Sequence, residues 1–162
     1  MELFDSYDKE QIVEKSGHLK ISDYKKHLRS VLEEYGFKYE NKIMRFLNGC
    51  EIAVELQKSD YSDAFYINCG FYVPSAHIDP KIIKAVKDCD VQIRFEHKNS
   101  LEKDKTLFDI QTTGLDSFSE IIRHNMDEMV VPIMNNGIQM LYEKEPNAIY
   151  CTKKELRAFL GI

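Results

Sequence analysis

The sequence has few residues that would break or cross-link the chain. Its four prolines and seven glycines are scattered along it. Scattered glycines argue against a Gly-rich phosphate-binding loop, and the lack of a Pro/Gly/Ser-rich linker argues against an internal domain boundary. The four cysteines lie far apart without a C-x-x-C pair, and the opening segment Met1–Ser6 is too short and too acidic for a secretory signal. We therefore expect a cytoplasmic protein with reduced thiols.

Excess positive charge and long apolar runs are also missing. The chain has 22 Lys and Arg against 27 Asp and Glu, which gives a net charge of -5. Nucleic acids and anionic membranes attract clustered positive charge, so we expect neither as a partner, whereas a basic protein partner is compatible. The longest apolar runs are only a few residues, too short to cross a hydrocarbon core of about 30 Å.

The remaining composition indicates one globular domain. With 162 residues and 43% hydrophobic content, the chain is long enough to bury a core without disulfides. We expect a single domain over residues 1–162, in which 1–20 form a peripheral segment with weak periodicity. Residues 22–136 then form the main core, and 137–162 form a C-terminal helical extension.

Several helix-start signals lie along the chain. Ser22 is a good N-cap for an amphipathic run that Gly36 would stop. Ser117-Phe118-Ser119-Glu120 is a capping box ahead of a longer amphipathic helix, which Pro132 would end or kink. A second capping box at Thr152-Lys153-Lys154-Glu155 predicts a short closing helix.

Alternating apolar residues predict the strands. They run over residues 37–47, 50–59, 65–73, 91–97 and 107–113. Asn48-Gly49 supplies a type I′ hairpin turn, Asp79-Pro80 would open a short helix through Lys87, and the charged stretch His97–Lys105 would join the last two strands as an exposed hairpin loop. Strands grouped in this way predict an α+β fold: a single antiparallel sheet of about five strands with helices packed on one face.

A set of short motifs resembles a known family. They lie between Leu28 and Val73 and comprise Gly36-Phe37, Met44-Arg45-Phe46, Leu56-Gln57-Lys58-Ser59 and Phe65-Tyr66-Ile67-Asn68-Cys69-Gly70-Phe71-Tyr72. Together they resemble the bacterial family called domain of unknown function 4304. The resemblance implies a small α+β domain with helices on a single sheet face. It implies no activity, so any functional residue has to be argued from its chemistry.

Catalytic and metal signatures are weak. The five histidines show no H-x-x-x-H spacing, and His77-x-Asp79 is the nearest approach to a ligand pair, although a loop histidine before an N-cap is the favoured interpretation. Cys50 and Cys69 fall on apolar registers, where a thiol behaves as a small hydrophobe. Glu51 and Glu55 could share a polar face with other carboxylates, but cross-strand salt bridges are favoured over acid/base work. The sequence indicates no catalytic residue, metal or cofactor.

The reverse registers of the strands predict a polar sheet face that is rich in amide, tyrosine and arginine side chains. The candidate binding residues are Glu55, Gln57, Tyr66, Asn68, Tyr72, Gln92, Arg94 and Gln111. Flat amphipathic rings beside directional donors and acceptors are typical of recognition surfaces, although an ordinary solvated sheet face would have a similar composition. Gly70, inside a strand, indicates a place where another group approaches closely.

Three functional hypotheses follow for this face. The leading one is a small cytoplasmic protein-binding or regulatory module, of which immunity proteins that neutralise toxins are one example. The alternative is a small-ligand binder or enzyme with a pocket between the sheet face and loops 75–79 and 97–105. A third is an oligomer contact.

Overall fold

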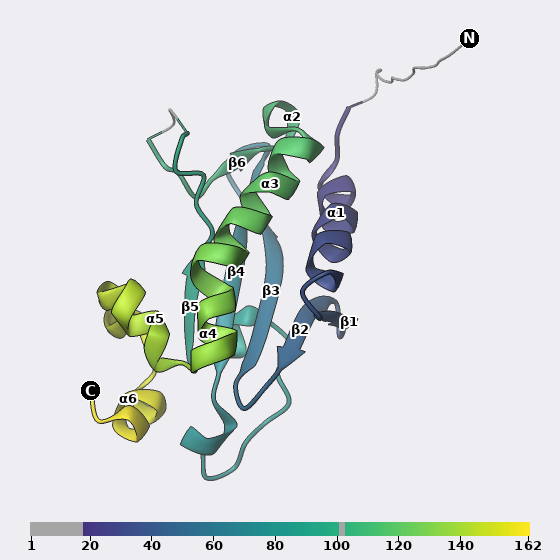
Figure 1. The fold of residues 1–162 in the computed structure, drawn as a ribbon. Coiled ribbons are helices and arrows are strands. Elements are labelled where there is room, and N and C mark those ends of the chain that lie inside the picture. The colour runs from purple at the N-terminus through teal and green to yellow at the C-terminus, as the bar shows by residue number, and fades with distance from the viewer. Residues whose placement is uncertain (1–17, 101–102) are drawn as a thin grey trace.

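The computed structural model describes residues 18–100 and 103–162, which form one antiparallel sheet with helices on one face (Figure 1). The predicted α+β class with a single antiparallel sheet is confirmed. The sheet has six strands, β1 (Lys38–Glu40), β2 (Ile43–Leu47), β3 (Glu51–Lys58), β4 (Ala64–Tyr72), β5 (Val91–Arg94) and β6 (Phe108–Asp109). Its order is β1-β2-β3-β4-β5, and β6 pairs with β4 beyond the end of β5.

The helices precede and follow the sheet in the chain. They are α1 (Ile21–Glu33), α2 (Ile110–Thr113), α3 (Leu115–Asn125), the π-helical turn η3 (Met126–Val130), α4 (Val131–Asn136), α5 (Gln139–Lys144) and α6 (Lys154–Leu160). Short 3-10 turns are η1 (Pro74–Ala76), η2 (Val86–Asp88) and η4 (Pro146–Cys151). In the part of the chain that the structure describes, no helix combines the length and the apolar character needed to span a membrane.

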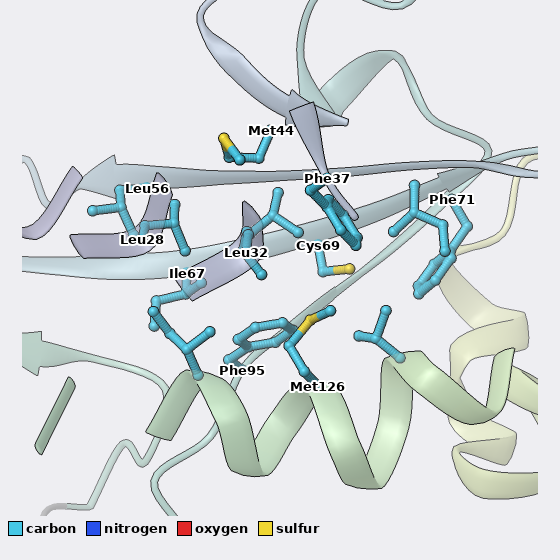
Figure 2. Close-up of a cluster of buried hydrophobic side chains, with 14 of the residues drawn as sticks. Leu28, Leu32, Phe37, Met44, Leu56, Ile67, Cys69, Phe71, Phe95 and Met126 are labelled. Atoms are coloured by element: carbon cyan, nitrogen blue, oxygen red, sulfur yellow. The ribbon is translucent and has the colours of Figure 1, made fainter. Parts of the chain in front are cut away.

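The main core lies between the sheet and the helices α1, α3 and α4. Figure 2 shows Leu28 and Leu32 of α1 and Met126 of η3 gathered against Ile67 and Cys69 of β4. Ile67 and Cys69 point to the same face of β4, because successive strand residues point to opposite faces and residues two apart therefore share a face. Alternation along β3 and β4 therefore identified the buried face correctly, whereas in β2 Met44, and not Ile43, lies in the main core.

Local hydrogen bonds shift several predicted boundaries. The first helix begins at Ile21, where the Asp23 carboxylate accepts from the Lys20 backbone N–H at 2.8 Å. The long helix begins after Gly114 and continues past Pro132 to Asn136, with a π turn in the position where the proline would otherwise clash with the preceding turn. Thus Pro132 does not end the helical rod.

Three predicted elements are wrong in their extent. The strand predicted over 37–47 is split by a turn at Asn41 and Lys42, both of which have positive φ angles. The helix predicted over 79–87 is reduced to the 3-10 turn η2. The strand predicted over 107–113 ends at Asp109, because the Asp109 carboxylate accepts from the backbone N–H groups of Gln111 and Thr112 and starts α2.

The predicted hairpin between the last two strands is also wrong. Strands β5 and β6 both pair with β4, one after the other along the same edge. Phe65 of β4 pairs with Phe108, whereas Asn68 pairs with Arg94. Each strand is held by backbone bonds to β4, which leaves the outer edge of β5 facing the C-terminal helices (Figure 1).

The segment between β4 and β5, residues 74–90, crosses the opposite face of the sheet and is called the strap below. Figure 1 shows it as the teal loop that passes under the sheet and returns behind it. Side chains of the strap form a second buried cluster with the sheet, consisting of Ile43, Ala53, Tyr72, Ile83, Val86 and Cys89. The predicted polar face is therefore partly covered by the protein's own chain.

Candidate recognition surface

Seven of the eight candidate residues lie on one face of the sheet. The register pairs Glu55 with Asn68 and Gln57 with Tyr66, and it pairs Asn68 with Arg94 on the other side. Gln111 is the exception, and its placement on this face is wrong. It lies in α2, where its amide donates to the Leu19 carbonyl at 2.8 Å, because the strand that would have carried it ends at Asp109.

The strap divides this face into a covered part and an open part. Glu55 accepts a hydrogen bond from the Val86 N–H at 2.7 Å, and the Tyr72 hydroxyl accepts one from the Lys81 N–H at 2.9 Å. Tyr72 is 1% exposed and its ring stacks on His77 with centroids 4.8 Å apart. Glu55, which is half-buried, and Tyr72, which is buried, therefore anchor the strap.

Gly70 is where the strap comes closest to the sheet. A Cβ atom at this position would lie 2.7 Å from the Cys89 Sγ and 2.9 Å from the Val86 Cγ1. The sequence correctly indicated a close approach at Gly70. The approaching group belongs to the same chain, since η2 packs directly on the bare backbone of β4.

The open part of the face carries a connected set of side chains, called the Asn68 network below: Gln57, Tyr66, Asn68 and Arg94. The Asn68 amide donates to Gln57 Oε1 at 2.7 Å, and its oxygen accepts from Arg94 Nε at 3.3 Å. The Arg94 guanidinium lies over the Tyr66 ring, 3.7 Å from its centroid. Gln57 and Arg94 are exposed, Tyr66 is half-buried and Asn68 is buried between them. The network therefore spans β3, β4 and β5 and holds its exposed members in fixed positions.

His77 belongs to the strap and pairs with Asp90. His77 lies in a loop, as the favoured interpretation expected, and its Nε2 lies 2.6 Å from Asp90 Oδ1. The other Asp90 oxygen accepts from the Val73 N–H at 2.8 Å, and Asp90 is 1% exposed. This buried carboxylate fastens both ends of the strap. Sequence reasoning missed it because its partners lie 13 and 17 positions away along the chain.

The carboxylates of the face are occupied by structural partners. Glu51 is buried at 5% exposure and pairs with Arg45, which also binds Glu40 at 3.0 Å. The hydrogen bond to Glu51 raises the pKa of Arg45. The expected cross-strand salt bridge therefore forms with Arg45, whereas Arg94 stacks on Tyr66. Glu51 and Glu55 are not a free acid/base pair.

The thiols also lie in structural positions. Burial raises the pKa of Cys50 to about 12, and burial raises the pKa of Cys69 and Cys89 as well, so none of them is an activated nucleophile. Cys151 is exposed. Among residues 18–100 and 103–162, no group of three or more His, Cys, Asp and Glu side chains could hold a metal ion.

A cavity of about 410 Å³ lies along the outer edge of β5. Ile93 and Arg94 line it from the sheet, Met129 lines it from η3, and Ala148 and Cys151 line it from η4. The pocket expected between the polar face and loops 75–79 and 97–105 would have joined His77, Glu55 and Arg94. Of these three, the cavity includes Arg94.

A comparison with protein families agrees with the resemblance seen in the sequence motifs. The profile of a family described as domain of unknown function (DUF4304) matches residues 28–136, more than half of the chain. The chain belongs to this family. The matched DUF4304 segment includes the strap and the whole Asn68 network, whereas α5, η4 and α6 lie beyond it. Neither the curated proteins nor the solved structures contain a match.

Proposed function

We propose that this DUF4304 protein is a cytoplasmic binding module of bacterial origin that recognises a protein partner through the Asn68 network. The observation that carries the proposal is the arrangement of Arg94 over Tyr66, with Asn68 bridging Arg94 and Gln57. Tyrosine and arginine are the residue types that most often dominate the energy of protein interfaces.

The fixed geometry of the network favours binding. An exposed arginine or glutamine loses side-chain entropy when it is immobilised in an interface, and that loss weakens association. In this protein Asn68 already orders both Gln57 and Arg94 before any partner arrives. The face would thus offer an aromatic ring, a guanidinium and an amide with little further ordering.

The charge of the chain narrows the kind of partner. The net charge of -5 favours encounter with a basic protein, because long-range attraction raises the association rate. Regulation or neutralisation of such a protein, as immunity proteins neutralise toxins, is the proposed role. Arg94 would then bind a carboxylate or carbonyl of the partner, on a chain that is acidic overall.

The test is quantitative capture of a partner by the purified chain and by the double variant Tyr66→Ala, Arg94→Ala. We expect the variant to lose about 2 kcal/mol or more, roughly thirtyfold in affinity, once the captured protein has been purified and titrated by calorimetry. Tyr61→Ala is the matched control, because Tyr61 is 97% exposed and lies outside the network. Equal affinity of the double variant and the wild type would refute the proposal.

The double variant has to be checked for folding before its affinity is interpreted. Arg94 is exposed and Tyr66 half-buried, so we expect its circular dichroism spectrum to match that of the wild type. Tyr72 is unsuitable for this experiment. It is buried under the strap, and its replacement would alter the fold rather than the recognition surface.

A further inference from the structure

The backbone of β5 alternates between β4 and the outer edge of the sheet. The Phe95 N–H donates to the Ile67 carbonyl at 3.0 Å, so odd-numbered residues of this strand direct their backbone groups to β4. Gln92, Arg94 and Glu96 direct theirs outward. This outer edge would normally be open to pairing with another strand.

The chain itself already satisfies both ends of that edge. The Lys153 N–H donates to the Asp90 carbonyl at 2.8 Å, and the Cys151 thiol lies 3.6 Å from the Gln92 carbonyl. At the other end, the Asn125 side chain accepts from the Glu96 N–H at 3.1 Å and donates to the Glu96 carbonyl at 2.9 Å. The Asn125 amide therefore substitutes for a residue of a neighbouring strand.

Arg94 lies between these two ends with its backbone open. Within residues 18–100 and 103–162, neither its outward N–H nor its outward C=O has a hydrogen-bond partner from the protein. Outward residues recur every two positions, so the gap from Gln92 to Glu96 measures about 13 Å, enough for a segment of three or four extended residues. An N–H and a C=O on one strand residue are the pair that a residue of an antiparallel strand satisfies.

The cavity of about 410 Å³ lies beside this open position. Ile93, Met129 and Ala148 supply apolar atoms on the helix side of it, while Asn125 and Cys151 bound its two ends. In a strand paired with Arg94, the two residues that flank the paired one would point to the helix side, against these apolar atoms. The paired residue would point to the opposite face, beside the Arg94 side chain.

We propose that this groove binds an extended peptide segment of a partner protein, which adds to β5 as an antiparallel strand. Its paired residue is acidic and lies opposite Arg94, because among the described residues Arg94 has no carboxylate in an ion pair. Its two neighbours are medium-sized apolar residues that fill the cavity against Ile93 and Met129. Strand addition of this kind draws affinity from main-chain bonds and specificity from alternate side-chain positions. The proposal shares Arg94 with the Asn68 network, but it does not require contact with Gln57, Tyr66 or Asn68.

The probe is the capped peptide acetyl-Val-Glu-Val-amide, which matches the length of the gap, and the readout is hydrogen exchange of backbone amides followed by NMR. At a peptide concentration ten times the dissociation constant, we expect exchange of the Arg94 amide to slow about elevenfold. The protection factor equals one plus the ratio of the free peptide concentration to the dissociation constant. The Phe95 amide is the internal control. It already donates to Ile67 and should change little.

Two altered peptides separate strand addition from adventitious contact. Methylation of the glutamate nitrogen removes the donor to the Arg94 carbonyl, and exchange of valine with glutamate places charges against the apolar side of the groove. Both changes should abolish protection of Arg94. Equal protection by the N-methylated peptide, or no protection by the parent peptide at millimolar concentration, would overturn the proposal.

Variants of the protein provide an independent readout. Cys151 is exposed at one end of the groove, so its modification with a bulky maleimide should block the peptide, while Cys151→Ser should not. Arg94→Glu should bind the lysine version of the peptide in preference to the glutamate version. Tyr66→Ala should bind the peptide with the affinity of the wild type, even if this variant no longer captures a protein through the Asn68 network. The two proposals can therefore fail separately.

Discussion

At the scale of single residues, the space around Gly70 decides how the strap can pack. No other residue type would leave room for both Cys89 and Val86 at this point of β4. The sequence marked the position through a glycine inside a strand, which is unfavourable unless another group needs the space. It could not say that the group is a distant part of the same chain.

We predict that Gly70→Ala destabilises the protein by about 1–3 kcal/mol, the usual cost of overpacking a filled interior. The added Cβ would meet the Cys89 Sγ at 2.7 Å, which forces η2 away from the sheet. Urea unfolding measures the loss. In the double variant Gly70→Ala, Cys89→Ala the loss should be smaller than the sum of the single losses, and simple additivity would count against this packing account.

At the scale of secondary-structure elements, the strap is held by polar side chains that the sequence suggested for binding. Glu55 and Tyr72 each accept a backbone N–H from the strap, and Asp90 fastens it through His77 and Val73. Among the other predicted residues of the sheet face, Gln57, Gln92 and Arg94 are exposed. The sequence could not distinguish the polar residues that anchor the strap from those that stay open. That distinction depends on the path of residues 74–90, which have little periodicity in the sequence.

We predict that Glu55→Ala loosens the strap and exposes Cys89. Loss of the acceptor leaves the Val86 N–H without its partner, at a cost of about 1–3 kcal/mol for a buried donor. Alkylation of Cys89 by iodoacetamide, followed by mass spectrometry, should therefore be faster in this variant than in the wild type. Gln57→Ala is the matched control on the same strand and should leave the rate unchanged; equal rates in Glu55→Ala and the control would contradict the anchoring role.

At the scale of the whole molecule, α1 and the α3–η3 rod are joined by buried and half-buried tyrosines. Tyr24 donates to the Ile110 carbonyl and accepts from the Gly114 N–H at 3.1 Å, and Tyr35 donates to Asp127 Oδ1 at 2.8 Å. Burial, reinforced by the hydrogen bond to Asp127, raises the pKa of Tyr35 to about 12. Burial also raises the pKa of Tyr24.

We predict that these tyrosines make stability fall in alkaline solution. A folded-state pKa above the unfolded value of 10.0 means that the contribution is complete below pH 10 and is lost as pH rises toward about 12. Denaturant unfolding at a series of pH values between 9 and 12 measures this slope. Tyr35→Phe should have a shallower slope, and an unchanged slope would exclude Tyr35 as a source.

The sequence by itself determined the antiparallel α+β class, the buried face of β3 and β4, and the family. A period of two along β3 and β4 places the large apolar side chains on the helix side, namely Ile52, Val54, Leu56, Phe65, Ile67, Cys69 and Phe71. A slip by one residue would turn all of them away from the helices, so this register is strongly specified. Helix boundaries were less well determined: the N-cap of α1 is Lys20 and not Ser22, and α3 begins after Gly114 and not at Ser117. Helix capping is a short-range effect, so sequence patterns place the helix ends to within about one turn.

Only the tertiary structure decided which part of the polar face remains open and where β5 has a free edge. The bond from Val86 to Glu55 joins residues 31 positions apart, and the bond from Glu96 to Asn125 joins residues 29 apart. No local pattern encodes such pairs, because they form when separate elements pack together. For that reason the Asn68 network and the groove at Arg94 became visible as distinct sites only in the folded chain.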